Sequence, residues 1–180
     1  MRHIQPRFVV SGLCGAVLLG LAGACGDAEP PTAPGVLSLS STIQGDGFTR
    51  VEGEAAGALW AVVEPDDWNG DLVVLLHGSV DQKAPISLDP LRHWWWNPMV
   101  DALVARGFGV AWSSYRVNGF AVEEGTVDTR IAEAMFAARF GRPRSTYLVG
   151  WSMGTHVGQK LLETSPARYA GFLSVCGSLG

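Results

Sequence analysis

Short runs of apolar residues, separated by polar or helical segments, recur along the chain from about residue 48 onward. Residues 71–77 (DLVVLLH) carry five apolar side chains in a row, which is typical of a strand buried on both faces of a parallel sheet. Other short strands rich in apolar side chains are predicted at 48–54, 58–63, 110–112, 146–149 and 171–176.

Helical patterns lie between the later strands. Residues 127–140 carry one apolar stripe at helical spacing, and we expect Thr126 to cap the start of this helix and Gly141 to end it. Further helices are predicted at 98–106 and at about 153–164. Strands that alternate with helices form parallel sheets covered on both faces. The predicted fold class is therefore α/β, a three-layer αβα sandwich with a mostly parallel sheet.

The N-terminal segment has the pattern of an export signal. Arg2 and Arg7 precede residues 8–24, which carry no charge and end in small residues. A positively charged start, an apolar middle and a small-residue end are the three parts of a signal peptide. A membrane-spanning helix is the alternative, although the stretch is short for one. We expect residues 1–24 to be a signal peptide.

Two processing routes fit the residues at the cleavage point. Ala22-Gly23-Ala24 matches the site of ordinary signal peptidase, and small residues directly before Cys25 resemble a bacterial lipobox, in which that cysteine is acylated. Residues 25–35 are polar and rich in proline, as in the tether of a lipoprotein. We therefore expect lipidation at Cys25 and anchoring at the cell membrane. Release into the periplasm or the medium is the alternative.

Composition and charge exclude several functional classes. The 180 residues are 47% hydrophobic and 17% charged, which provides enough apolar material for a folded core. The net charge of −4 and the lack of a basic block argue against a nucleic-acid partner. The three cysteines lack the paired spacing of a zinc site, and the sequence contains no phosphate loop or dinucleotide fingerprint. We expect neither a metal nor a cofactor.

One motif carries candidate chemistry, the sequence Gly-Trp-Ser-Met-Gly at 150–154. The G-x-S-x-G pattern is weak evidence alone, but here it lies between the predicted strand 146–149 and the helix that follows. A serine at such a junction occupies a tight, strained turn, and glycine on either side avoids collisions with the strand and the helix. The turn exposes the Ser152 hydroxyl at a helix N-terminus, where amide groups favour an anion. The alternative is a serine that caps an ordinary helix.

With this motif in place, the sequence resembles the α/β-hydrolase superfamily over about residues 48–180. The resemblance rests on the Ser152 turn, on the strand that leads into His77-Gly78, and on the order of the elements. The run up to Cys176-Gly177 resembles secreted bacterial esterases and prolyl-oligopeptidase-like members. The resemblance implies that residues 36–180 form a hydrolase domain.

The resemblance also implies a mechanism. Ser152 would be the nucleophile, and the backbone N–H groups of Met153 and Ser79 would form the oxyanion hole. The substrate would be a small ester, or alternatively a peptide, cleaved through an acyl-enzyme. Acyl transfer to an acceptor other than water is not distinguishable from sequence. A non-catalytic, surface-anchored binding protein on a hydrolase scaffold is the alternative function.

The partners of the serine are not evident. In this superfamily an acid and then a histidine follow the serine along the chain. The sequence after Gly154 contains only Glu163 and His156, and both lie on the helix next to the serine, where we expect His156 to pack or cap locally. We therefore expect the acid and the histidine beyond Gly180, so that the hydrolase domain is incomplete and the polypeptide inactive by itself.

Two further residues are candidates for substrate binding. Tyr115 and Asn118 follow the strand 110–112, on the same carboxyl edge of the predicted sheet as Ser152. Loops at this edge hold the binding sites of α/β proteins. Asp128 precedes the serine, and we expect it to be a solvated position on its helix.

Overall fold

The computed structural model describes residues 38–89 and 96–177, all within one compact unit of the chain, Pro31–Gly180. The predicted signal peptide, the tether and Cys25 lie outside the described residues, so they stay predictions. No helix within the described ranges is long and apolar enough to cross a membrane.

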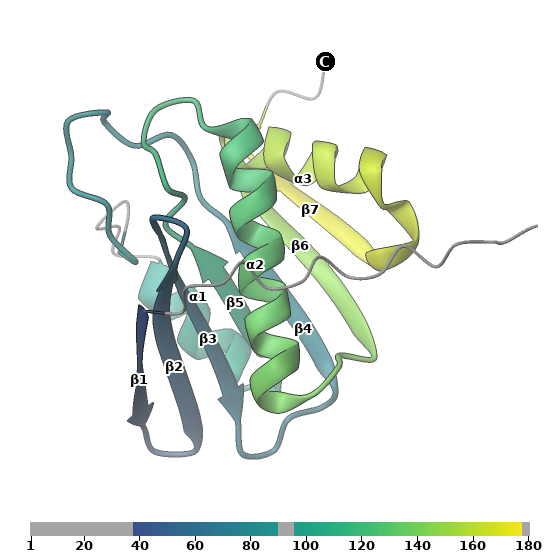
Figure 1. The fold of residues 1–180 in the computed structure, drawn as a ribbon. Helices are drawn as coiled ribbons and strands as arrows, with labels where there is room; N and C mark the ends of the chain where they lie inside the picture. Colours follow the sequence, from purple (N-terminus) through teal and green to yellow (C-terminus); the bar gives the residue numbers. More distant parts are fainter. Residues whose placement is uncertain (1–37, 90–95, 178–180) are drawn as a thin grey trace, which may run out of the picture. The chain divides into compact units, whose positions relative to one another are not determined.

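A seven-stranded sheet forms the centre of the unit, in the order β1-β2-β3-β5-β4-β6-β7 (Figure 1). Its strands are β1 (Ser38–Gln44), β2 (Phe48–Ala55), β3 (Ala58–Pro65), β4 (Asp71–Leu76), β5 (Gly109–Ser113), β6 (Ser145–Trp151) and β7 (Gly171–Val175). β4 to β7 pair in parallel, whereas β1, β2 and β3 form an antiparallel meander that joins β5. Because β2 then runs in the direction of the parallel strands, the sheet is mostly parallel, as predicted. β1 was not predicted, since its sequence SLSSTIQ has little apolar pattern.

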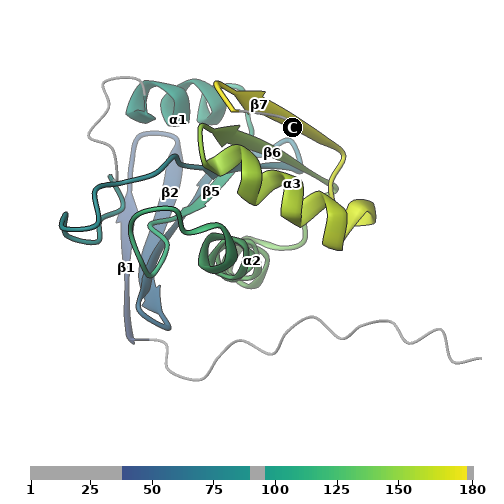
Figure 2. The ribbon, with the colours of Figure 1, turned by 90° about the horizontal axis from the view of Figure 1, so that it is seen from above.

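Helices cover both faces of the sheet, which confirms the three-layer architecture. In Figure 2, α1 (Trp96–Val104) lies on one face, and α2 (Val122–Phe140) and α3 (Gly154–Thr164) lie on the other. α2 begins earlier than predicted. The Thr126 hydroxyl donates to the Val122 carbonyl oxygen at 2.8 Å from inside the helix, so the prediction that it caps the helix was wrong.

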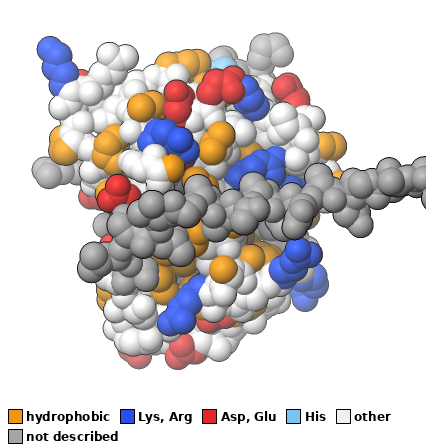
Figure 3. Space-filling view, viewed as in Figure 1, with side chains coloured by type: hydrophobic (Ala, Val, Ile, Leu, Met, Phe, Trp, Pro, Cys, Tyr) orange, Lys and Arg blue, Asp and Glu red, His pale blue; other side chains and the backbone are white. Residues whose placement is uncertain are grey.

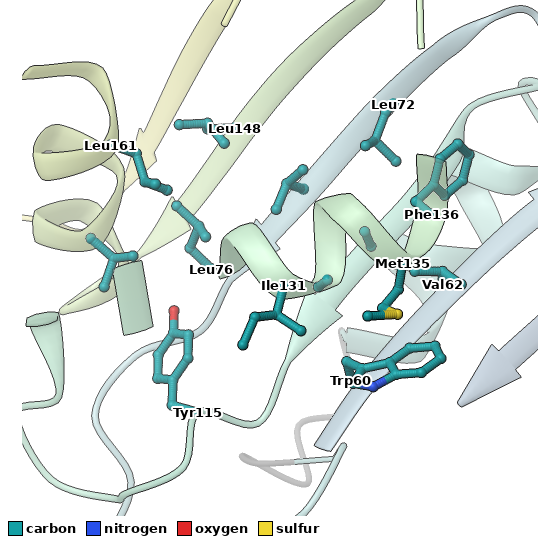
Figure 4. Close-up of a cluster of buried hydrophobic side chains, with 14 of the residues drawn as sticks. Trp60, Val62, Leu72, Leu76, Tyr115, Ile131, Met135, Phe136, Leu148 and Leu161 are labelled. Carbon is teal, nitrogen blue, oxygen red and sulfur yellow. The ribbon is translucent and has the colours of Figure 1, made fainter. Parts of the chain in front are cut away.

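Two apolar clusters, one on each face, hold the layers together. Leu72, Val74 and Leu76 of β4 point into the cluster under α2 and α3, whereas Val73 and Leu75 point into the cluster under α1. This alternation explains why β4 is apolar at every position from Leu72 to Leu76. Figure 4 shows the larger cluster, to which several elements contribute Trp60, Val62, Leu72, Leu76, Tyr115, Ile131, Met135, Phe136, Leu148 and Leu161.

Ion pairs join α2 to α3 and to the segment that follows α3. Glu123 of α2 pairs with Lys160 of α3, and the buried Glu133 of α2 accepts a hydrogen bond from Arg168 at 2.9 Å. Side chains of both signs are interspersed over the face that carries α2 and α3 (Figure 3). The parallel strands bring four chain segments to one edge of the sheet, namely those after β4, β5, β6 and β7.

Candidate active site

Ser152 lies at the junction of β6 and α3, where the chain turns sharply from strand to helix. Its φ of 50° falls in the left-handed region, which is uncommon for residues other than glycine. The residue is exposed, and its backbone N–H donates to the Val175 carbonyl oxygen of β7 at 2.9 Å. Backbone strain of this kind persists only where the surrounding structure imposes it, and it clusters at functional sites. The strained turn expected from the motif is present.

The glycines at 150 and 154 are required by close approach of the backbone. A β-carbon added to Gly150 would lie 2.7 Å from the Gly154 carbonyl oxygen, and one added to Gly154 would collide with the Leu76 carbonyl oxygen of β4. No real β-carbon approaches backbone so closely. Only glycine at both positions lets α3 start this near to β4 and β6, and this arrangement holds Ser152 above the strand ends.

The end of β4 brings a second loop next to the serine. Leu76 pairs with Gly150, so the next residues of β4 and β6 continue side by side beyond the sheet. A β-carbon added to Gly78 would lie 3.1 Å from the Ser152 Cβ and 3.7 Å from its Oγ. The backbone of Gly78 therefore passes directly beside the nucleophile candidate, and Ser79 follows it.

Two backbone donors are available at this place. Met153 is the N-terminal cap of α3, so its N–H lies at the positive end of the helix dipole. Neither this N–H nor the N–H of Ser79 donates to any other residue that the structure describes. Two unengaged N–H groups beside a serine hydroxyl are the donor set that an oxyanion hole requires.

His77 is a buried structural neighbour of this loop. Its side chain is 2% exposed, its Nδ1 lies 2.7 Å from the Gly78 carbonyl oxygen, and its ring stacks on that of Tyr115 with centroids 3.9 Å apart. Burial lowers the pKa of His77 from 6.5 to about 4, and hydrogen bonds to the backbone of Gly78 and of Ser114 oppose only part of this shift. The ring is therefore neutral at pH 7.

The two predicted substrate contacts occupy different environments. Tyr115 is 0% exposed, and burial raises the pKa of its hydroxyl, so this residue belongs to the core and its side chain does not face an open surface. Asn118 is half-buried, and its amide nitrogen donates to the Ala84 carbonyl oxygen at 2.7 Å. A substrate contact at Asn118 stays a prediction, whereas one at Tyr115 conflicts with its complete burial.

The loop between β5 and α2 is fixed to both neighbouring loops. The Gly119 N–H donates to the Val80 carbonyl oxygen at 2.9 Å, and the Ala121 N–H donates to the Met153 sulfur at 3.1 Å. The same loop thus contacts the segment after β4 and the first residue after Ser152. These bonds join residues far apart in the sequence, and no local pattern indicated them.

Asp128 was expected to be solvated, and this expectation was wrong. Its side chain is 0% exposed and accepts hydrogen bonds from the Arg116 backbone N–H at 2.8 Å and from the Arg116 guanidinium. A buried carboxylate persists only with such partners. The sequence did hold a signal, because Asp128 lies three and seven residues before Ile131 and Met135, on the buried stripe of α2.

No residue in the described ranges forms a hydrogen bond with the Ser152 hydroxyl. His156 lies on α3 with its ring 5.6 Å from that of Phe120, and Glu163 is exposed near the end of the same helix. Among the residues described, no group of three His, Cys, Asp or Glu side chains could hold a metal ion.

Comparisons with known proteins identify the fold of this chain. A scan against family models and a search of curated protein sequences gave no match. Among solved structures, the rice cell wall degrading esterase LipA from Xanthomonas oryzae matches with a TM-score of 0.56 at 16% identity, over 79% of this chain and 50% of that chain. An esterase from the bacterial hormone-sensitive lipase family matches with a TM-score of 0.53 at 18% identity, over 74% and 45%. A Pyrococcus furiosus esterase matches with a TM-score of 0.50 at 16% identity, over 79% and 55%.

These likenesses establish the fold. The chain has the α/β-hydrolase fold, with the mixed sheet and the covering helices of these esterases. It spans about half the length of the structures that it matches.

Proposed function

We propose that this protein is a serine hydrolase that cleaves esters through an acyl-enzyme on Ser152. The observation that carries the proposal is an exposed serine, held at a φ of 50° in a strand-to-helix turn, beside two backbone N–H groups that no other described residue engages. Esters are preferred to peptides because the neighbours in fold are esterases. Transfer of the acyl group to another acceptor would use the same first step.

The reaction follows from this arrangement. The Ser152 oxygen attacks the ester carbonyl carbon, and the carbonyl oxygen becomes an anion that the N–H groups of Met153 and Ser79 stabilise. Departure of the alcohol leaves the acyl group on Ser152. Attack by water on this acyl-enzyme then releases the acid and restores the serine.

The attack also needs a base that accepts the proton of Ser152. His77 is unsuited, because its ring is buried and its Nδ1 is engaged by the Gly78 carbonyl oxygen. Under this proposal the base and its orienting carboxylate lie outside the described residues. A polypeptide that lacks them would not turn over substrate.

Labelling with a fluorophosphonate probe tests the proposal on the protein as its gene encodes it. We expect the probe to modify wild type and the Ser41→Ala control, which changes an exposed serine of β1, and not to modify Ser152→Ala. Mass spectrometry of the labelled peptide identifies the modified residue. Equal labelling of wild type and Ser152→Ala would remove Ser152 as the nucleophile.

A non-catalytic binding protein on the same scaffold is the second candidate. It is favoured by one observation, that Ser152 has no base among the residues described. Absence of labelling in the gene-encoded protein, together with hydrolysis of no ester in a panel of p-nitrophenyl esters, would favour this candidate over the enzyme.

We also propose that the protein is exported and anchored through a lipid on Cys25. The support is the sequence pattern of residues 1–35. Cys25→Ser should move the protein from the membrane fraction to the soluble fraction of the host. Cys176→Ser, which changes an exposed cysteine of the folded unit, is the matched control and should leave it in the membrane fraction. Unchanged fractionation of Cys25→Ser would contradict acylation.

A further inference from the structure

The side chain of Phe120, on the loop between β5 and α2, lies mostly in solvent. It is 70% exposed, more than any other large apolar side chain that the structure describes. Its neighbours Gly119 and Ala121 are both buried, so the chain turns inward on either side of the ring. Single exposed apolar side chains are common on protein surfaces, so the position of this ring has to decide whether it has a role.

The loop places this ring beside the start of α3, where Ser152 lies. The Ala121 N–H donates to the sulfur of Met153, the residue directly after Ser152. The centroid of the Phe120 ring lies 5.6 Å from that of His156, in the first turn of α3. In Figure 1, the loop after β5 and the start of α3 lie at the same end of the sheet. An exposed aromatic ring and an exposed serine hydroxyl therefore share this end of the sheet.

Hydrogen bonds hold the chain on both sides of Phe120. Before it, the Asn118 amide nitrogen donates to the Ala84 carbonyl oxygen at 2.7 Å, and the Gly119 N–H donates to the Val80 carbonyl oxygen at 2.9 Å. After it, the hydrogen bond to the methionine sulfur, 3.1 Å long, holds the start of α2. An aromatic side chain has only two χ angles, so a ring on a held backbone loses little conformational freedom when a ligand covers it.

We propose that Phe120 is a specificity residue whose exposed ring binds an apolar chain of the ester substrate. Contact with an alkyl or aryl group removes the surface of the ring from water, which favours binding. Val117, which is 41% exposed, adds apolar surface to the same loop. The substrate class is esters with several carbons in the acyl or the alcohol part. The inference rests on the proposed function, because a chain bound here is selected in catalysis only if Ser152 attacks the ester.

The size of the effect follows from the area that the ring covers. Complete removal of one methylene group from water is worth about fourfold in a binding constant. Two further methylenes that lie partly against the ring should therefore raise kcat/KM by about tenfold. The contact is remote from the reacting bond and is made equally in the ground state and the transition state. The gain should therefore come from a lower KM, with kcat unchanged.

The first experiment compares the hydrolysis of three esters by the protein as its gene encodes it. Ethyl acetate is the reference, ethyl butyrate extends the acyl chain by two methylenes, and butyl acetate extends the alcohol chain by two. In wild type, kcat/KM for one extended ester should exceed that for ethyl acetate by about tenfold. In Phe120→Ser this ratio should fall to about two or less. The extension that loses its gain identifies the chain that lies against the ring.

Two further variants serve as controls. Phe120→Leu retains an apolar side chain, so it should keep most of the gain. Ile43 is 47% exposed on β1, at the far side of the sheet, so Ile43→Ala should leave the ratio as in wild type. The same ratios in wild type and Phe120→Ser for both extended esters would overturn the inference. This outcome includes a loss of equal size for all three esters, which a merely structural role of the ring would produce.

The second experiment separates this inference from the proposed function. Butyl butyrate carries both chains, and Ser152→Ala leaves it uncleaved. NMR of this variant should show nuclear Overhauser effects between the ester chain and the Phe120 ring, assigned by their loss when Phe120→Leu is added. If wild type hydrolyses no ester but these effects are present, the proposed function fails and the apolar contact remains. If esters are hydrolysed and the effects are absent, the inference about Phe120 fails and the hydrolase remains.

Discussion

Replacement of either partner in the buried ion pair between Asp128 and Arg116 should lower the free energy of unfolding, but by different amounts. The Asp128 side chain is 0% exposed, whereas that of Arg116 is 31% exposed. Loss of the arginine leaves a fully buried carboxylate with the backbone N–H of residue 116 as its remaining donor. Loss of the aspartate leaves a guanidinium that water can still reach.

The magnitudes follow from this asymmetry. Removal of one partner of a buried pair costs about 3–5 kcal/mol when the remaining charge stays buried, so we expect Arg116→Gln to lower the free energy of unfolding by about 4 kcal/mol. Asp128→Asn loses hydrogen bonds to a charged group that can be rehydrated, so we expect a loss of about 2 kcal/mol. Arg144→Gln is the matched control. Arg144 pairs with Asp71 through two similar bonds, but its side chain is 71% exposed, and we expect a loss below about 1 kcal/mol.

Urea denaturation followed by tryptophan fluorescence measures these differences. With a slope of about 2 kcal/mol per molar urea, Arg116→Gln should lower the midpoint by about 2 M and Asp128→Asn by about 1 M. The Arg144→Gln control should shift the midpoint by less than about 0.5 M. A larger loss in Asp128→Asn than in Arg116→Gln would refute the reasoning from burial. So would equal losses in Arg116→Gln and the control.

Three further outcomes are expected. Gly154→Ala should destabilise the protein and slow labelling of Ser152, because its new β-carbon collides with the Leu76 carbonyl oxygen; unchanged urea midpoint and labelling would contradict the close approach. Phe136→Ala, at a side chain with 0% exposure, should lose about 3–5 kcal/mol in the same urea assay, and a loss under about 1 kcal/mol would show that the site is not packed as described. The folded pKa of His77 is about 4 and its ordinary value is 6.5, so the unfolded chain binds the extra proton first. The contribution of neutral His77 to the free energy of unfolding is therefore complete above pH 6.5, and this free energy should fall by about 3 kcal/mol as the pH is lowered to 4. Urea titrations at several pH values should find a weaker dependence in His77→Asn.

Three loops that meet at one edge of the sheet form the candidate site. The turn at Ser152 supplies the exposed hydroxyl and the N–H of Met153, and the segment after β4 supplies the N–H of Ser79. The loop after β5 contributes no reacting group in this arrangement. Its hydrogen bonds to Val80 and Met153 instead connect it to the other two loops and fix their positions.

The sequence by itself determined the features that depend on neighbouring residues. The apolar run at 71–77 indicated a strand buried on both faces, and the alternation of patterns indicated the covered parallel sheet. The turn at Ser152 was also predictable, because the collisions that exclude side chains at Gly150 and Gly154 arise wherever a strand turns directly into a helix.

Only the tertiary structure decided which distant residues meet. Burial of Asp128 and Tyr115, the contact of Gly78 with Ser152 and the bond from Ala121 to Met153 all join segments from different strands and helices. An aspartate in a helix has the same local pattern whether it faces water or Arg116, because its environment is set by the packing of another loop against it. Local propensity therefore fixed the elements and the turn, whereas long-range packing fixed the state of each side chain around them.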